Sequence, residues 1–188
     1  MTDGPHRSLP MRRHWKDLAE RAAKSIFSQE SVREALPYAL KKDAREIPLE
    51  RVRDILGGGR QGKLFQEDRI AQLEDARNNC RGSALGNAVI NCAIEAVTDG
   101  LTGDKACGTA LKNAFDEYTR NAFRGVEEHY QREGSDCSAR FVRERLDAAR
   151  IQCDFGGLAS EIMSSEKPAN STARLPKHTG IDEGPSLP

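Results

Sequence analysis

A four-residue repeat of small apolar side chains constrains the fold of this chain more than any other feature of its sequence. The repeat comprises Ala106, Ala110, Ala114, Tyr118, Ala122, Val126 and Tyr130. Residues four positions apart lie on one face of an α-helix, so the pattern predicts one long helix with a narrow apolar stripe. Alanine in such a stripe lets neighbouring helix axes approach closely, which favours a helical bundle.

The same helical period occurs in most of the remaining sequence. Further apolar stripes lie within residues 15–27, 32–40, 49–56, 70–80, 85–97 and 142–153. Pro37 has no N–H and predicts a kink or a break in the second of these helices, whereas Pro48 suits the first turn of the third. No segment alternates with the period of two that a half-buried strand requires. We therefore expect an all-α multi-helix bundle with short N-terminal helices.

The composition along the chain predicts four regions. We expect a flexible N-terminus (1–11), a basic helical region (12–82), a helical bundle (83–157) and a disordered C-terminal tail (158–188). The tail is expected because the last 25 residues contain four of the eight prolines and few apolar side chains. No stretch approaches the roughly 18 consecutive apolar residues of a membrane span. The first residues also lack the apolar core of a Sec signal peptide.

The net charge of zero conceals an uneven distribution. Residues 1–63 carry 14 basic and nine acidic side chains, and residues 64–188 carry 15 basic and 20 acidic ones. A basic front half suggests a nucleic acid or another anionic partner, although mixed charges also fall unevenly by chance.

The five cysteines (Cys80, Cys92, Cys107, Cys137 and Cys153) form no C-x-x-C pair. This spacing argues against a structural zinc site, and we expect no cofactor. An odd number of cysteines favours thiols in a reducing, cytoplasmic location. One or two disulfides in an exported protein remain the alternative.

The glycine-rich stretch GGGRQGK at residues 57–63 matches part of a phosphate-binding loop. However, Leu64 stands where Mg²⁺ coordination requires Ser or Thr, and a charged helical pattern precedes the glycines where a buried strand is needed. We therefore do not expect an NTPase.

A Pro-initiated helix, a glycine turn and a further helix in residues 39–73 have the layout of a helix-turn-helix. This segment resembles the N-terminal DNA-binding region of plasmid KfrA-type proteins. The matching residues are Pro48, Val52, Arg53, Leu56, Gly57, Gly58 and Gly59. Leu49 and Arg60 depart from the pattern, because a small hydroxyl residue and Ser are usual there. The resemblance implies a DNA-binding function.

In such a layout the first turns of the third helix face the major groove. We expect Arg60, Gln61, Lys63 and Gln66 to lie nearest the base edges, because Arg and Gln can make bidentate contacts to guanine and adenine. Lys41, Lys42, Arg45, Arg51 and Arg53 are the expected phosphate contacts. The alternative is a plain glycine-rich linker with solvated basic side chains.

Signals for catalysis are poor. His129 and Glu133 share one helix face and could bind a metal or transfer a proton, but such a pair is usually a solvated ion pair. The first functional hypothesis is a non-enzymatic accessory or regulatory protein that binds double-stranded DNA and has a helical association region. The alternatives are a protein-interaction module, a homo-oligomer or an exported effector without a Sec signal, and a His129-centred metal enzyme.

Overall fold

The computed structural model describes residues 12–24, 29–58, 65–80, 82–133 and 136–165. These ranges contain eight α-helices and no strand, which confirms the all-α prediction. The helices are α1 (Arg13–Lys24), α2 (Gln29–Ala44), α3 (Leu49–Leu56), α4 (Gln66–Asn78), α5 (Ala84–Thr98), α6 (Gly103–Arg132), α7 (Asp136–Gln152) and α8 (Phe155–Ser165). Within those ranges, no helix has both the length and the apolar character needed to cross a membrane.

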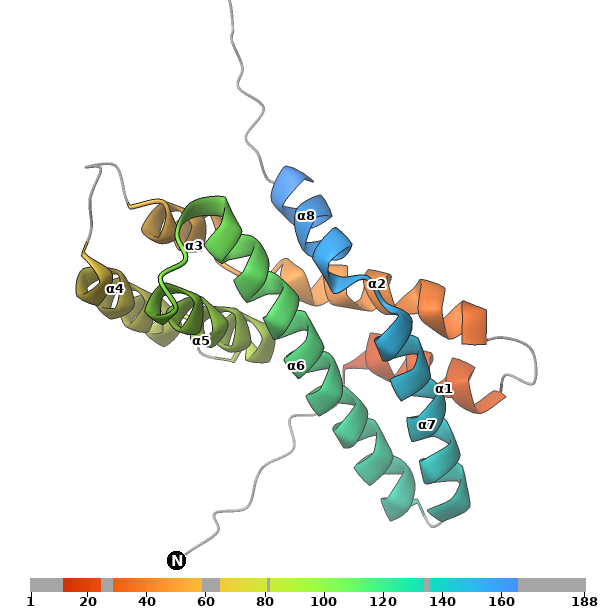
Figure 1. The fold of residues 1–188 in the computed structure, drawn as a ribbon. Helices are drawn as coiled ribbons and strands as arrows, with labels where there is room; N and C mark the ends of the chain where they lie inside the picture. Colours follow the sequence, from red (N-terminus) through yellow and green to blue (C-terminus); the bar gives the residue numbers. More distant parts are fainter. Residues whose placement is uncertain (1–11, 25–28, 59–64, 81, 134–135, 166–188) are drawn as a thin grey trace, which may run out of the picture.

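The long helix α6 is the axis of the fold. Its 30 residues correspond to about 45 Å at 1.5 Å per residue. In Figure 1, α4 and α5 lie toward the first half of α6, and α7 runs beside its second half. The predicted repeat forms the buried stripe, since Ala106, Ala110 and Ala114 have no exposed surface. These small side chains explain how α6 can contact five other helices.

The N-terminal helices belong to the same core as the rest of the bundle. Helices α1 and α2 pack against α7, and α3 packs against α6 and α4. Buried apolar residues from all eight helices form one continuous cluster. The expected regions 12–82 and 83–157 are therefore joined by packing across their boundary, and this arrangement fixes where the basic residues of the first region point.

The predicted start of the disordered tail at residue 158 is wrong. Residues 158–165 belong to α8, which buries Leu158, Ala159 and Ile162 and packs against α6. Apolar residues at helical spacing supply this buried face, so the segment orders by packing. The expected flexible N-terminus (1–11) and residues 166–188 of the expected tail lie outside the described part of the chain.

Helix α2 continues through Pro37 and ends at Ala44. Of the kink or break that Pro37 predicted, the break is therefore absent. The buried residues Val32, Leu36 and Leu40 hold this helix against its neighbours on both sides of the proline. Packing of an apolar face can thus compensate for the hydrogen bond that proline cannot make.

Candidate nucleic-acid interface

Three of the five predicted phosphate contacts form ion pairs within the protein. Lys41 Nζ lies 2.6 Å from Glu161 of α8. An Arg51 guanidinium nitrogen lies 2.6 Å from Asp75 of α4. These two cations therefore project in different directions, toward different helices.

Arg53 connects α3 to two other helices. It donates a hydrogen bond to the carbonyl oxygen of Met163, near the end of α8, at 3.0 Å. Its second nitrogen lies 3.2 Å from Asp104 in the first turn of α6. Arg53 thus satisfies a carbonyl group at a helix end, where no partner within the helix is available.

The remaining two phosphate contacts, Lys42 and Arg45, are exposed on α2 and the turn that follows. Within the described residues, neither has an acidic side chain in ion-pair distance. Lys42 follows Tyr38 by four positions, which places both on one side of α2, and Arg45 lies in the turn just after the helix. Tyr38 is 68% exposed, and Lys41 Nζ lies 5.7 Å from the centre of its ring. We call Tyr38, Lys41, Lys42 and Arg45 the basic end of α2.

The residues expected to read bases are placed only in part. Arg60, Gln61 and Lys63 lie outside the described residues. Gln66 is in the first turn of α4, and its side-chain amide donates to the carbonyl oxygens of Val97 and Thr98 at 3.0 and 3.3 Å. Gln66 thus supplies hydrogen bonds to carbonyl groups at the C-terminal end of α5, which have no partner within that helix.

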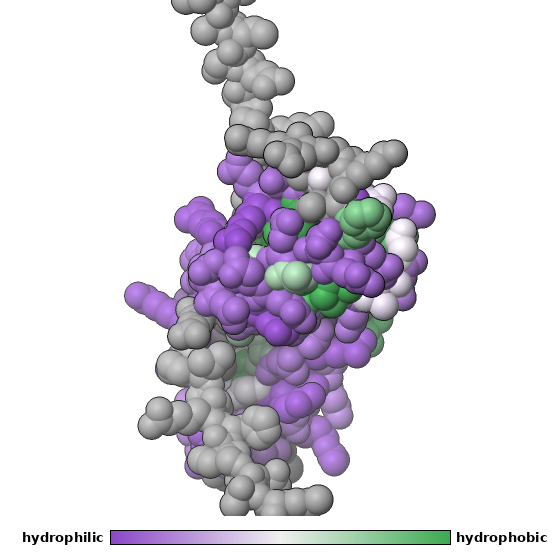
Figure 2. Space-filling view, turned by 90° about the vertical axis from the view of Figure 1, so that its left-hand side faces the viewer, coloured by the Kyte–Doolittle hydropathy of each residue, from purple (hydrophilic) through white to green (hydrophobic). Residues whose placement is uncertain are grey.

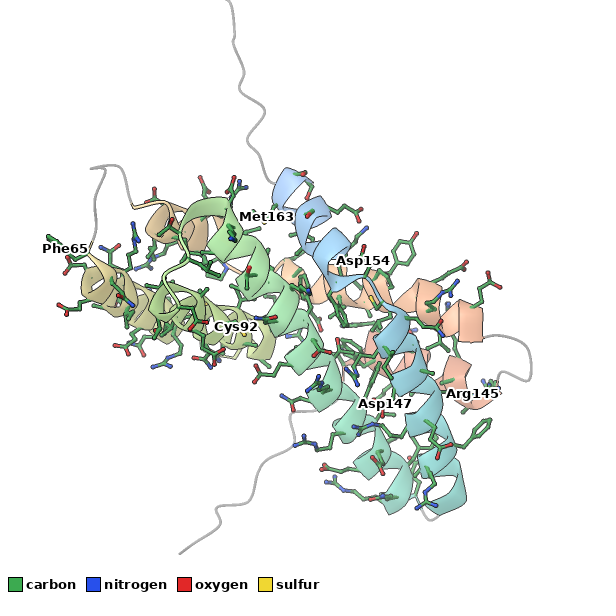
Figure 3. All side chains as sticks on the ribbon, in the orientation of Figure 1. Phe65, Cys92, Arg145, Asp147, Asp154 and Met163 are labelled. Carbon is green, nitrogen blue, oxygen red and sulfur yellow. The ribbon has the colours of Figure 1, made fainter. Side chains whose placement is uncertain are left out.

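The surface of α4 is acidic at its start, where Glu67 and Asp68 are exposed. Phe65 precedes this helix, is 79% exposed and points away from the bundle (Figure 3). The face that the bundle presents on this side is mostly hydrophilic with small apolar areas (Figure 2). The five predicted phosphate contacts do not lie together on one face of the molecule, and none of them lies on α4. The most compact group is the basic end of α2.

A groove of about 390 Å³ runs between α1 and α2 beside this basic end. Its lining residues are His14, Asp17, Leu18, Arg21, Ser31, Glu34, Ala35, Tyr38, Ala39 and Lys42. The groove therefore combines an apolar floor, one aromatic ring and charged groups of both signs.

A buried carboxylate that sequence analysis did not identify, Asp43, contacts His14, one of the residues that line this groove. Asp43 is 1% exposed and accepts hydrogen bonds from Trp15 Nε1 (2.9 Å), Tyr118 Oη (2.5 Å) and Arg12 (2.8 Å). His14 Nε2 lies 2.9 Å from the same carboxylate. A signal for it existed: position 43 continues the buried stripe of Leu36 and Leu40 at helical spacing.

The environment of Asp43 determines its protonation state. Burial would raise the pKa of Asp43, but the hydrogen bonds from Tyr118 and Trp15 and the nearby His14 outweigh this effect and lower it. Burial and the neighbouring carboxylate together raise the pKa of Tyr118. The cluster is therefore an ionised carboxylate held by neutral and cationic donors. It connects α1, α2 and α6, which is a structural role.

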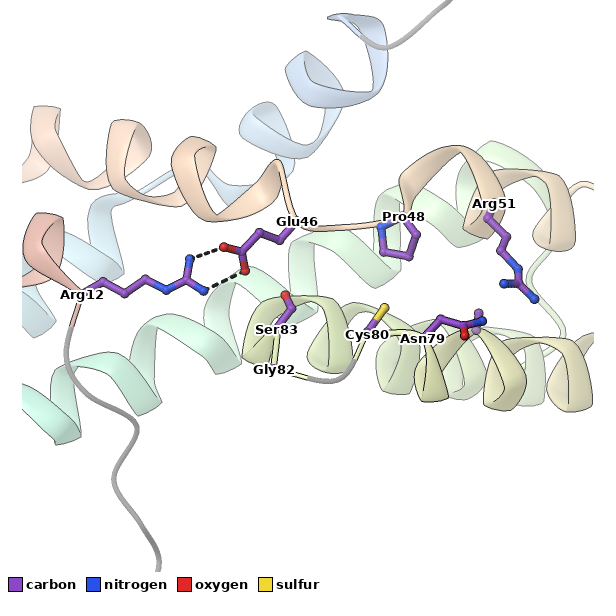
Figure 4. Close-up of a pocket in the computed structure, with 9 residues that line it drawn as sticks. Arg12, Glu46, Pro48, Arg51, Asn79, Cys80, Gly82 and Ser83 are labelled. Carbon is purple, nitrogen blue, oxygen red and sulfur yellow. Dashed lines mark hydrogen bonds and ion pairs between the residues drawn. The ribbon is translucent and has the colours of Figure 1, made fainter.

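A second pocket of about 440 Å³ lies between the α2–α3 turn and the end of α4 (Figure 4). At one end Arg12 donates to both oxygens of Glu46, at 2.7 and 2.8 Å. Cys80 contributes a thiol whose pKa is raised by burial, so it carries little thiolate at neutral pH. Without an activated nucleophile or base, this pocket does not indicate catalysis.

Cys80, Cys92, Cys107 and Cys153 are thiols and form no disulfide with another described residue. Burial, with Glu117 nearby, raises the pKa of Cys92 to about 12, and burial raises that of Cys153 to about 11. Cys92 is buried and Cys153 is partly buried, so both act as small packed side chains rather than reactive thiolates. Nothing is described for the side chain of Cys137.

The predicted pairing of His129 and Glu133 is present, with 3.2 Å between Nε2 and the carboxylate. Both side chains are largely solvated. The described ranges contain no group of three or more His, Cys, Asp or Glu side chains placed to hold a metal ion. Among the described residues, the metal-enzyme hypothesis is therefore supported only by the His129–Glu133 pair on the surface.

The fold and its candidate interface thus define an all-α helical bundle with a basic, aromatic-flanked helix end. No protein-family model, curated protein or solved structure matches the chain. The resemblance of residues 39–73 to KfrA-type proteins therefore stays a prediction.

Proposed function

We propose that this protein is a non-enzymatic accessory protein that binds DNA phosphates at the basic end of α2. The observation that supports the proposal best is the exposure of Lys42 and Arg45, which have no acidic partner among the described residues. Two exposed cations, one in the last turn of α2 and one in the turn that follows, can replace counterions along a phosphate backbone. Arg60, Gln61 and Lys63 follow α3 and stay proposed base contacts.

Basic side chains at a helix C-terminus also have a purely structural role, because they interact favourably with the helix dipole. The two roles differ in what happens when the charges are removed. A structural role predicts lower stability, whereas a binding role predicts weaker DNA binding with little change in stability.

Fluorescence anisotropy with a labelled DNA duplex, titrated at several salt concentrations, tests the proposal. Binding should weaken steeply with salt, and Lys42→Gln/Arg45→Gln should reduce the slope of log affinity against log salt by about 2. Lys105→Gln/Arg124→Gln is the matched control, since it removes two exposed positive charges from α6. If the unmodified protein does not bind DNA at low salt, the proposal is wrong.

A helical association function is our second proposal. It is supported by Ile151 on α7, a large aliphatic side chain that is 73% exposed. Single exposed apolar residues are common on monomers, so the proposal needs a direct measurement. Light scattering should show a molar mass that rises with concentration and falls to that of one chain in Ile151→Glu. A constant single-chain mass for the unmodified protein would contradict it.

We also propose a reducing, cytoplasmic location, based on the described thiols. The denatured protein, isolated without reductant, should then titrate as five thiols. A lower count would show that cysteines are paired and would favour the exported alternative.

A further inference from the structure

The groove between α1 and α2 has the chemical features of a site for a single nucleobase. Its floor is apolar, formed by Leu18, Ala35 and Ala39, and the ring of Tyr38 stands at its edge. A volume of about 390 Å³ lies within the range of small-ligand pockets. The flat face of a base can stack on an exposed aromatic ring, and this contact does not depend on sequence.

The charges of the groove are arranged in a way that suits a base better than a phosphate. Asp17 and Glu34 line it, and carboxylates accept hydrogen bonds from the amino groups of bases. The same carboxylates repel phosphate. Cations are available at the α2 end of the groove, where Lys42 lines it and Arg45 follows three residues later in the turn after the helix. A nucleotide can therefore place its base in the groove and its phosphate at the basic end of α2.

We propose that this groove binds one unpaired base of single-stranded nucleic acid, stacked on Tyr38, with the adjacent phosphate at Lys42 and Arg45. This inference rests on the proposed DNA-binding function and specifies its substrate class. Bases within a duplex are paired and stacked on one another, so they cannot enter such a groove without being extruded. A single strand supplies unstacked bases at no such cost. Arg21 is the other cation that lines the groove, and His14 lies among its lining residues.

The test compares the affinity of the full chain for a labelled single-stranded oligonucleotide, for the corresponding duplex and for a mononucleotide. The single strand should bind most tightly. Tyr38→Ala should weaken single-strand binding by about 5- to 100-fold, which corresponds to the loss of one base–aromatic stack, and Tyr38→Phe should retain it. Phe141→Ala, at another exposed aromatic side chain, is the matched control and should leave binding unchanged.

The outcomes separate the inference from the proposed function. Equal affinity for single strand and duplex, or unchanged binding in Tyr38→Ala, would overturn the inference and leave DNA binding in place. A mononucleotide that binds as tightly as the strand would overturn the single-strand assignment and indicate a free-nucleotide site. No binding of any form at low salt would refute the proposed function itself. Tyr38 is exposed, so circular dichroism should show the same helicity in its variants.

Discussion

At Asp43, one buried carboxylate receives hydrogen bonds from residues that lie 28 and 75 positions away in the sequence. Asp43→Asn keeps the shape of the side chain but removes one of the two carboxylate charges that Arg12 contacts. We expect a loss of about 3 kcal/mol in the free energy of unfolding, because the buried donors around position 43 would then face a neutral amide instead of a carboxylate that accepts their hydrogen bonds. Urea unfolding measures this loss. Asp54→Asn, at an exposed position on α3, is the control and should change stability little.

The lowered pKa of Asp43 predicts a pH dependence of stability. Its carboxylate stabilises the fold fully above the usual value of 3.8, and this contribution is lost as the pH falls through the lower value of the folded state. The unmodified protein should therefore lose more stability than Asp43→Asn on acidification below this range. Fluorescence of Trp15, the single tryptophan, reports the transition. Parallel losses in the two proteins would contradict the prediction.

Thr119 on α6 is fully buried, and its hydroxyl has no hydrogen-bond partner among the described atoms. A buried polar group without a partner costs free energy. We expect Thr119→Val to raise the melting temperature or leave it unchanged, with a gain of up to about 1 kcal/mol. Thr119→Ala should lower it by leaving a cavity. A clear loss in Thr119→Val would show that the hydroxyl is satisfied in solution.

At the scale of elements, α2 contains a proline that lowers the stability of the helix, and packing of the helix compensates for this. Pro37 lies inside this helix, where proline is about 3 kcal/mol less favourable than alanine. Pro37→Ala should therefore raise the melting temperature. Pro48→Ala is the control, because Pro48 precedes α3 at a position that needs no backbone N–H. Equal effects at the two positions would contradict this explanation.

Elements with a strong apolar period were predictable, and a weakly patterned one was missed. The sequence places α6 correctly because seven residues repeat at a constant spacing. Residues 158–165 of α8 were predicted as disordered, since they precede a proline-rich and polar segment, although Phe155, Leu158 and Ile162 have helical spacing. Short helices are marginal alone, so their formation depends on a surface to pack against.

At the scale of the whole molecule, ion pairs between the basic residues 1–63 and the acidic residues 64–188 neutralise part of the uneven charge distribution. Lys41, Arg51 and Arg53 pair with Glu161, Asp75 and Asp104, respectively. All three acidic partners lie beyond residue 63. The basic front half thus faces acidic groups of its own chain, and an overall charge count overstates the positive charge that a polyanion can reach.

If the proposed DNA binding holds, the ion pair between Lys41 of α2 and Glu161 of α8 competes with DNA for Lys41. Glu161→Gln should raise DNA affinity a few-fold, because it removes a negative charge 2.6 Å from this lysine. Stability should change by less than about 1 kcal/mol, since both side chains are partly exposed. Glu128→Gln on α6 removes an equal but distant charge and is the control. Identical affinities in the two variants would show that Lys41 does not contact DNA.

The sequence by itself determined the all-α class, the axis of the bundle and most of the buried stripes, because helix periodicity is a local property of the chain. It also identified the basic residues. Only the tertiary structure decided that Asp43 is buried beside Tyr118, that Arg53 contacts α8, and that Lys42 and Arg45 stay exposed. These outcomes depend on how helices far apart in sequence pack together, and side-chain partners across such distances leave no periodic signal in one sequence.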